Sequence, residues 1–221
     1  EEIFSKNSLA NIIQHFVRLD GETLYFPRYH QLDVVRKLIN DVSQNGVGKT
    51  YLIQHSAGSG KSNSITWSAY QLIEAYPISE NVQGSKGLDY PLFDSVIIVT
   101  DRKLLDKQLR DNVKSFSEQK NIVAPAYSSS ELKSNLENGK KIILTTIQKF
   151  PFIVDGIADL SEKRFAVIID EAHSSQSGSA HGKMNEAMGK KEYDEELDAQ
   201  DLVLEIMKNR KMKGNASYLA F

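Results

Sequence analysis

Three short runs of uninterrupted apolar residues constrain the fold more than any other feature of the sequence. They occupy residues 96–99 (VIIV), 142–144 (IIL) and 167–169 (VII), and segments with helical spacing separate them. Short strands that are apolar on both faces belong to parallel sheets covered by helices on both sides. We therefore predict an α/β domain with a mostly parallel central sheet and helices on both faces.

The spacing of apolar residues and the positions of Gly and Pro predict the other elements. Residues 78–91 have the composition of a surface loop, and residues 174–200 that of a mobile segment. Further strands are expected at 51–54, 122–127 and 217–221. Helices are expected at 8–17 (capped by Ser8), 31–43, 61–76, 102–117, 129–138 and 201–209.

The composition limits what kind of protein this is. The 221 residues, 40% of them hydrophobic and 25% charged, suffice for a globular domain with its own core. The formal net charge of −2 gives no overall attraction to nucleic acid, so any such contact must come from local patches. Cysteine is absent, which excludes disulfides and thiolate metal sites. No apolar run approaches the roughly 20 residues of a membrane-spanning helix, so no membrane contact is expected.

Two stretches have the composition of a phosphate-binding loop, residues 46–50 (GVGKT) and 58–62 (GSGKS). Such a loop must follow a strand and enter a helix, because the amides of the turn and the helix N-terminus then point at the phosphates. The first stretch follows a helix and precedes a strand, so Gly46 is better interpreted as a helix C-cap. The second has the required context, although His55 stands where the usual pattern has glycine. The predicted phosphate ligands are Gly58, Ser59, Gly60, Lys61 on the terminal phosphates and Ser62 on Mg²⁺.

Two carboxylates follow the predicted strand that ends at residue 169. Asp170, at the strand tip, would complete the Mg²⁺ shell opposite Ser62, and Glu171 would orient and deprotonate the attacking water. An isolated acidic pair of this kind is often a helix cap, but here a phosphate loop follows another parallel strand. We expect residues 61–62 and 170–171 to face each other across one crevice, wide enough for a magnesium triphosphate.

An ordered series of motifs resembles the motor of the restriction (R) subunit of type I restriction enzymes. Residues 170–173 (DEAH) also resemble the Walker B motif of superfamily-2 helicases and translocases. The resemblance covers roughly residues 8–221. The other motifs are residues 28–31 (RYHQ), 54–62 (QHSAGSGKS), 99–102 (VTDR) and 145–150 (TTIQKF).

The resemblance implies a fold and an activity. The fold would be a RecA-like three-layer domain with ATP and Mg²⁺ as cofactors. The activity would be ATP-driven translocation of double-stranded DNA before cleavage, in a cytoplasmic complex with methylation and specificity subunits. Alternatives are another superfamily-2 DNA or RNA helicase, or a scaffold that binds ATP without turning it over.

The resemblance also implies roles for residues outside the phosphate loop. Gln31 would read adenine, because a carboxamide can pair with both N6 and N7. Arg28 and Tyr29 could stack near the base, with a core position as the alternative for Tyr29. The histidines at 15, 30 and 181 have no metal-ligand spacing, and we interpret them as structural or solvated.

Further residues are implied in contacts with DNA and with a second motor lobe. Thr145 and Thr146 fall in a segment that contacts the DNA backbone. Arg102, with Lys103 and Lys107, could do the same or form a solvated charged face. His173 and Gln176 would couple the nucleotide site to the other lobe, with a structural role as the alternative for His173. Ser174 stands where the family often has Arg, so a contact by that Arg is not expected here.

The resemblance divides the chain at residue 27. Residues 1–26 would connect to a nuclease domain, and residues 27–221 would form the first RecA-like motor domain. Residues 218–221 (YLAF) would lead into a Thr-Ala-Thr-Pro motif beyond the end of the chain. The second lobe would supply arginine fingers, which are worth about 10³–10⁵ in rate. We therefore expect the chain alone to bind ATP weakly, to hydrolyse it slowly and not to translocate DNA.

Overall fold

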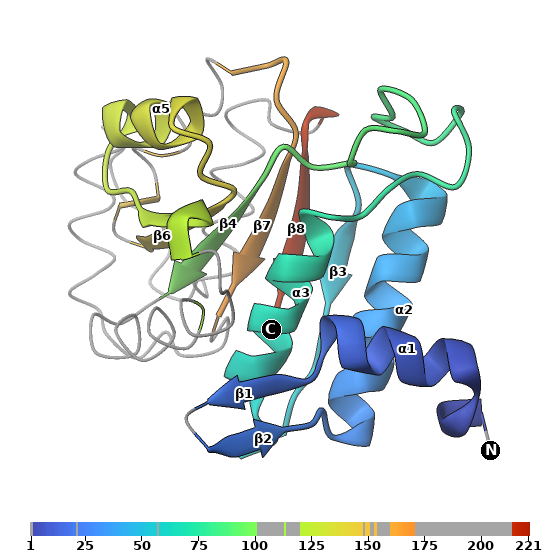
Figure 1. Ribbon diagram of the computed structural model, residues 1–221. Coiled ribbons are helices and arrows are strands. Elements are labelled where there is room, and N and C mark those ends of the chain that lie inside the picture. The colour runs from blue at the N-terminus through green and yellow to red at the C-terminus, as the bar shows by residue number, and fades with distance from the viewer. Residues whose placement is uncertain are drawn as a thin grey trace.

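Six parallel strands form the centre of the protein in a computed structural model (Figure 1). The structure describes residues 2–20, 22–56, 58–100, 113, 120–147, 149–150, 153, 160–170 and 214–221. In the sheet, the strands follow the order β3-β8-β7-β4-β6-β5. They are β3 (Thr50–Leu52), β4 (Ser95–Thr100), β5 (Val123–Pro125), β6 (Ile142–Thr146), β7 (Phe165–Ile169) and β8 (Ala216–Ala220).

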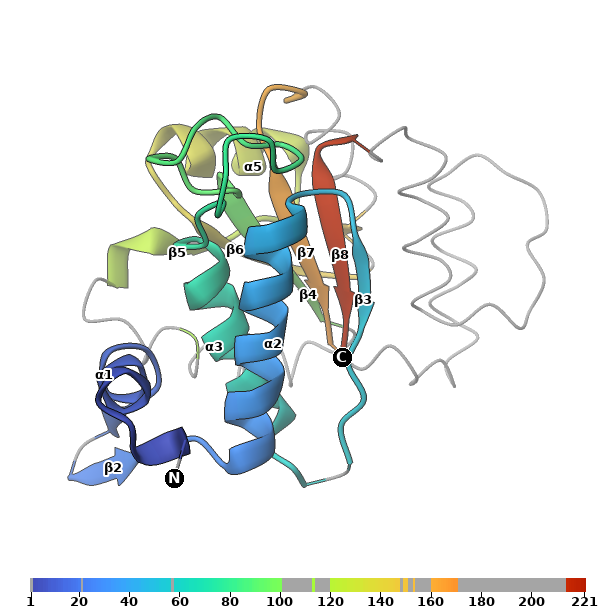
Figure 2. The ribbon, with the colours of Figure 1, turned by 90° about the vertical axis from the view of Figure 1, so that its right-hand side faces the viewer.

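Helices pack on both faces of this sheet. The helices are α1 (Lys6–His15), α2 (Tyr29–Asn45), α3 (Lys61–Leu72) and α5 (Ser129–Glu137). Along β4, Val96 and Ile98 belong to the hydrophobic cluster formed with α2 and α3, which lie together on one side of the strands (Figure 2). The alternate residues Ile97 and Val99 belong to the cluster on the other face, which contains Leu132 of α5. The predicted α/β architecture is confirmed, because each apolar strand is buried on both sides.

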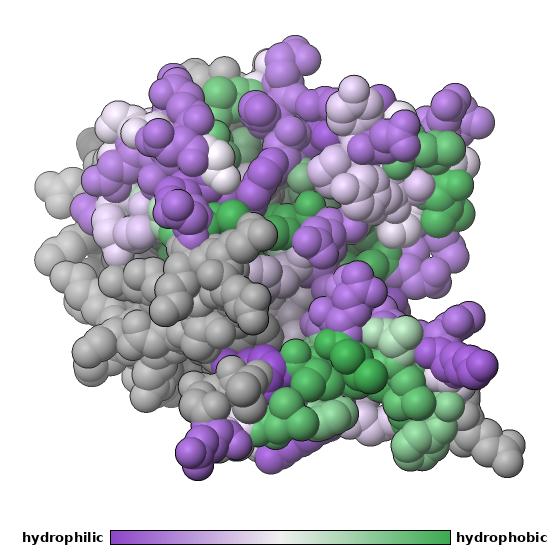
Figure 3. Space-filling model, viewed as in Figure 1, coloured by the Kyte–Doolittle hydropathy of each residue, from purple (hydrophilic) through white to green (hydrophobic). Residues whose placement is uncertain are grey.

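The N-terminal segment packs on α2 and α3 through a third hydrophobic cluster. Ile12 and Phe16 belong to this cluster with Leu32 and Val35 of α2 and Trp67 of α3, and the indole Nε1 of Trp67 donates to the carbonyl of Phe16 at 3.0 Å. A short antiparallel hairpin follows, formed by β1 (Arg18–Asp20) and β2 (Thr23–Tyr25). An apolar surface lies over α1 and this hairpin (Figure 3). Whether residues 1–26 connect to a nuclease domain stays a prediction.

Several predicted boundaries were wrong. The first helix begins at Lys6 and is capped by Ser5, whose Oγ accepts from the amide of Ser8 at 3.3 Å. The third helix ends at Leu72 and not at residue 76. Strand β3 spans Thr50–Leu52 and not residues 51–54. It lies at the sheet edge, and 58% of Leu52 is exposed. The hairpin at 18–25 was not predicted. The predicted helices at 102–117 and 201–209 and the segment 174–200 lie outside the described elements.

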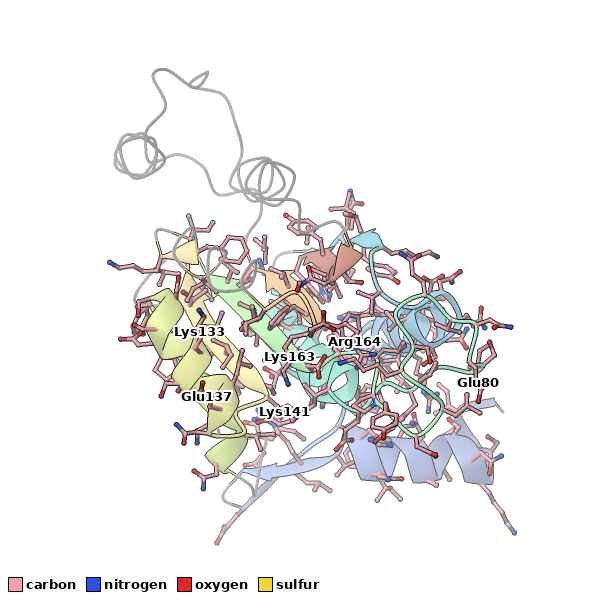
Figure 4. All side chains as sticks on the ribbon, turned by 90° about the horizontal axis from the view of Figure 1, so that it is seen from above. Glu80, Lys133, Glu137, Lys141, Lys163 and Arg164 are labelled. Carbon is pink, nitrogen blue, oxygen red and sulfur yellow. The ribbon has the colours of Figure 1, made fainter. Side chains whose placement is uncertain are left out.

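The loop between α3 and β4 is tied to the sheet end that lies away from the phosphate loop. The guanidinium of Arg164 donates to the carbonyls of Gly84 and Pro91 and to the carboxylate of Asp94. Figure 4 shows Arg164 on the sheet side of this loop and Glu80 on its outer side. Gly46 ends α2 as predicted, with φ +77°, and a Cβ there would lie 1.9 Å from the carbonyl oxygen of Gln83.

Within the described ranges, no helix is long and apolar enough to cross a membrane.

Candidate active site

The second glycine-rich stretch has the backbone geometry of a phosphate-binding loop. The chain leaves the end of β3 and enters α3 at Lys61, and both points lie at the same end of the sheet (Figure 2). Gly58 and Gly60 have φ values of +72° and +81°, a region that residues with a side chain adopt only with strain. Gly60 is the N-cap of α3, so the first amides of that helix are available to an anion.

The structure brings Lys61 and Asp170 together. Lys61 Nζ lies 2.9 Å from Asp170 Oδ1, although the two residues lie in different motifs far apart in the sequence. Asp170 directly follows β7, and its side chain is 7% exposed, against 26% for Lys61. Lys61 and Asp170 therefore lie at one place, as predicted, but in direct contact, so the predicted opening wide enough for a magnesium triphosphate does not lie between these two side chains. Glu171, the predicted base, lies outside the described residues.

The site also offers the oxygen donors that a hard cation requires. The Lys61–Asp170 contact has ion-pair distance but not hydrogen-bond geometry, so Asp170 Oδ1 is buried without a hydrogen bond among the described residues. Ser62, the second residue of α3, is exposed at the helix start. Carboxylate and hydroxyl oxygens are the ligands that Mg²⁺ prefers. The part of the chain that is described holds no group of three or more His, Cys, Asp or Glu placed for a metal.

The start of α2 lies against the phosphate loop. Gln31 is 2% exposed, and its Oε1 accepts from the amide of Arg28 at 2.8 Å. Its Nε2 donates to the carbonyls of Ser59 and Gly60 at 3.1 and 3.0 Å. Both hydrogens of this amide are thus used within the protein, and reading of adenine by Gln31 stays a prediction. Tyr29 is 71% exposed, which excludes a core position for it.

His55 occupies the position where a glycine was expected, and it contacts the loop. Its Nδ1 lies 2.9 Å from the hydroxyl of Ser59, and its ring stacks on Phe221 at 5.9 Å between centroids. Burial lowers the pKa of His55, and the nearby charges of His30 and Lys61 lower it further, so the imidazole is neutral at pH 7. His30 also contacts the loop, because its Nε2 donates to the carbonyl of Ser59 at 3.0 Å.

These two histidines were not identified as site residues from the sequence. In the sequence, His55 is a departure from the usual loop pattern, and His30 is interpreted as structural or solvated. Their contacts join α2, the loop and the end of β8, which are distant in the chain. No sequence spacing signals such contacts.

The residues predicted to contact DNA are only partly described. Thr145 and Thr146 lie at the end of β6 and are 0% and 5% exposed. Since both side chains are buried, DNA could reach them only after neighbouring groups move, and their contact with DNA stays a prediction. The predicted residues Arg102, His173 and Gln176 lie outside the described residues.

Related proteins bear on these motifs. One relative, from Mycoplasma pneumoniae, is described as the C-terminal part of the endonuclease subunit of a putative type I restriction enzyme, MpnIIP. It is 27% identical over 82% of this chain and 88% of its own length. Type I restriction enzyme endonuclease subunits SauCOLORF180P from Staphylococcus aureus and HindI from Haemophilus influenzae are 27% and 28% identical over 78% and 80% of this chain. The chain spans only 17% of the length of these last two.

Solved structures show the fold. The UvsW helicase from bacteriophage T4 matches 98% of this chain and 60% of its own, with a TM-score of 0.52 and 13% identity. A nuclease-deletion mutant of the Type ISP restriction-modification enzyme LlaGI, solved with a DNA substrate mimic, matches 88% of this chain and 17% of its own, with a TM-score of 0.53 and 14% identity. The predicted RecA-like fold is thus confirmed. The profile of the SWI2/SNF2 ATPases matches residues 30–193, so the chain belongs to the SWI2/SNF2 ATPase family, and its curated relatives are type I restriction enzyme endonuclease subunits.

Proposed function

We propose that this chain is the ATP-binding motor lobe of the restriction subunit of a type I restriction enzyme. It would use ATP hydrolysis to translocate double-stranded DNA before cleavage, together with methylation and specificity subunits. The observation that carries the proposal is the 2.9 Å contact between Lys61 and Asp170, which joins the phosphate loop to the carboxylate after β7. The names of the relatives support the restriction subunit in particular.

The residues of the site divide the work of phosphoryl transfer. The amides at the start of α3 and the ammonium of Lys61 bind the phosphates of ATP and offset their negative charge. Ser62 and Asp170 would hold Mg²⁺, which would supply positive charge next to the transferred phosphoryl group. Glu171 holds the attacking water and accepts its proton. His55 and the N-terminal residues of α2 contact the loop from outside the phosphate site.

The test is ATP hydrolysis by the full-length protein with and without duplex DNA. Lys61→Ala and Glu171→Gln should each abolish DNA-stimulated hydrolysis, and Lys37→Ala, on the exposed side of α2, should leave it unchanged. Full activity in either site variant would contradict the assignment. A protein that binds ATP but shows no hydrolysis with any DNA would be a scaffold, and hydrolysis stimulated only by RNA would indicate another helicase.

A further inference from the structure

Three exposed lysines converge on one aspartate at the end of the sheet that lies away from the phosphate loop. Lys86 Nζ and Lys163 Nζ lie 3.5 and 3.9 Å from the carboxylate of Asp94. Lys141 Nζ donates to the carbonyl of the same residue at 3.5 Å. We propose that these lysines, here called the lysine triad, bind phosphates of a duplex DNA backbone. The inference takes duplex DNA as the ligand from the proposed function, but it does not depend on the ATP site.

The order of the strands places the triad in a row. Asp94 directly precedes β4, Lys141 directly precedes β6, and Lys163 stands two residues before β7. In the sheet, β4 lies between β6 and β7. Figure 4 looks onto this end of the sheet, where Lys141, Lys163 and Arg164 lie near one another. Because neighbouring strands lie about 4.8 Å apart, Lys141 and Lys163 begin about 10 Å apart on the two sides of Asp94. One strand of DNA carries a phosphate for about every 3.4 Å of axis, so a row of this length faces about three phosphates.

Positive charge is in excess at this place. Arg164 already pairs with Asp94, because its amide and its Nε donate to Asp94 Oδ2 at 2.9 and 3.2 Å. Among the described residues, Asp94 is the only carboxylate in ion-pair contact with the triad. Each lysine therefore meets one negative charge and three positive charges, and the positive charges repel one another. A bound polyanion would relieve this repulsion, whereas the pair of Arg164 and Asp94 does not require the lysines.

The triad is accessible to a large ligand, and the arginine beneath it is not. The side chains of Lys86 and Lys163 are 44% and 50% exposed, against 8% for Arg164. Arg164 also donates to the carbonyls of Gly84 and Pro91, so it fixes the loop before β4. The exposed cations of this cluster are thus all lysines. Lysine is depleted in protein–protein interfaces but contacts phosphates as a point charge, which favours a DNA backbone over an acidic protein segment.

The triad is separate from the proposed ATP site. It stands before the strands, whereas the phosphate loop and Asp170 follow strands. Strand β4 has six residues, which span about 20 Å between the two ends of the sheet. Contacts from lysine to phosphate carry no direct sequence information. The triad would therefore hold this chain on duplex DNA of any sequence, and it would do so whether or not ATP is bound.

The test measures binding of a fluorescently labelled DNA duplex by fluorescence anisotropy, without nucleotide, over a series of NaCl concentrations. One contact between a cation and a phosphate contributes about −0.9 to the slope of log K against log salt. Lys86→Gln, Lys141→Gln and Lys163→Gln should therefore each reduce the slope by about 0.9, and the triple variant should reduce it by about 2.7. Each single variant should bind about eightfold more weakly at roughly 0.1 M NaCl, relative to 1 M NaCl, where the contact contributes little.

Two variants control for charge and for local structure. Lys37→Gln removes the same charge from an exposed position on α2 and should keep the affinity and slope of the wild type. Lys163→Arg keeps the charge and should also bind like the wild type. Urea unfolding without DNA separates the proposal from a structural role. If Lys163 served to hold Asp94, Lys163→Gln would lower the urea midpoint, whereas surplus charge predicts a midpoint that is unchanged or raised.

Each outcome decides the matter. An unchanged slope in the triple variant would overturn the triad as a DNA site, and so would a wild type that does not bind the duplex. A Lys163→Arg variant as weak as Lys163→Gln, or a lowered urea midpoint in Lys163→Gln, would also contradict it. If poly-glutamate binds through the triad and duplex DNA does not, the site takes an acidic protein segment. Absence of ATP hydrolysis in the full-length protein would reject the proposed motor and leave the result for the triad standing.

Discussion

The ion pair between Lys61 and Asp170 allows a quantitative test of the site geometry through protein stability. The perturbations are Lys61→Met and Asp170→Asn, which remove one charge each with little change of volume. At 2.9 Å the Coulomb attraction is about 6 kcal/mol for an effective dielectric constant of roughly 20. Desolvation of Asp170, whose side chain is 7% exposed, offsets much of this, and water reaches Lys61, which is 26% exposed. We therefore expect a net coupling free energy of about 1–3 kcal/mol.

The assay is a double-mutant cycle by urea unfolding. The free energies of unfolding of the wild type, both single variants and the double variant give the coupling energy directly. Because the pair is largely buried, 1 M NaCl should reduce the coupling only slightly. The pair Lys37–Asp33 on α2 is the control, since its nitrogen–oxygen distance is similar at 2.8 Å but its side chains are 76% and 38% exposed. That cycle should show a coupling of at most about 0.5 kcal/mol.

A coupling below about 0.3 kcal/mol for Lys61 and Asp170 would refute the reasoning, because it lies within the usual error of additivity. The phosphate loop and the end of β7 would then not meet as the structure has them. A large coupling that disappeared in 1 M NaCl would also count against the geometry, since it would indicate an exposed pair.

Two further predictions concern the loop and the opposite end of the sheet. Gly60→Ala should lower the free energy of unfolding by about 1–3 kcal/mol more than Gly58→Ala. Both glycines have a positive φ, but only at Gly60 would a Cβ meet a neighbour, Gln31 Nε2 at 2.4 Å. Equal losses of stability for the two variants in urea unfolding would contradict this close approach. Acid should destabilise the protein partly through Asp94: burial raises its pKa, but the hydrogen bond from the Arg164 amide and the charges of Lys86 and Arg164 outweigh this and hold the pKa below the ordinary 3.8. This stabilisation is fully present above pH 3.8 and is lost as the pH falls through the lower pKa of Asp94 in the native state. In the Asp94→Asn variant, the free energy of unfolding should therefore change less with pH in that range. An unchanged pH dependence would exclude a contribution from Asp94.

The sequence was sufficient for the features that depend on local pattern. The apolar runs of β4, β6 and β7 predicted a parallel sheet, because a strand buried on both faces leaves no room for polar alternation. The loop at 58–62 and the carboxylate at 170 were found from the strand that precedes each of them. Since parallel strands end at the same edge of a sheet, their meeting followed from the fold class alone.

The sequence was insufficient where spatial neighbours decide the structure. The predicted end of the third helix at residue 76, just before Pro77, was only approximate. The helix stops at Leu72, and the carbonyl of Ala75 accepts from the amide of Leu92 instead. The exposure of β3 depends on its place at the sheet edge, which no residue of the strand encodes. The hairpin at 18–25 has strands of three residues, too short for an alternation pattern to stand out.

The edge position of β3 also explains why the phosphate loop needs contacts from outside the sheet. This strand has three residues and, among the described strands, pairs only with β8, so it fixes little of the loop that follows it. The loop instead is held from two sides, by Gln31 and His30 on α2 and by His55, which stacks on Phe221 beyond β8. Ser59 stands between them, with its carbonyl bound from α2 and its hydroxyl in contact with His55. A shift of α2 relative to β8 would therefore move both polar groups of Ser59 and with them the amides at the start of α3 that we propose for phosphate binding.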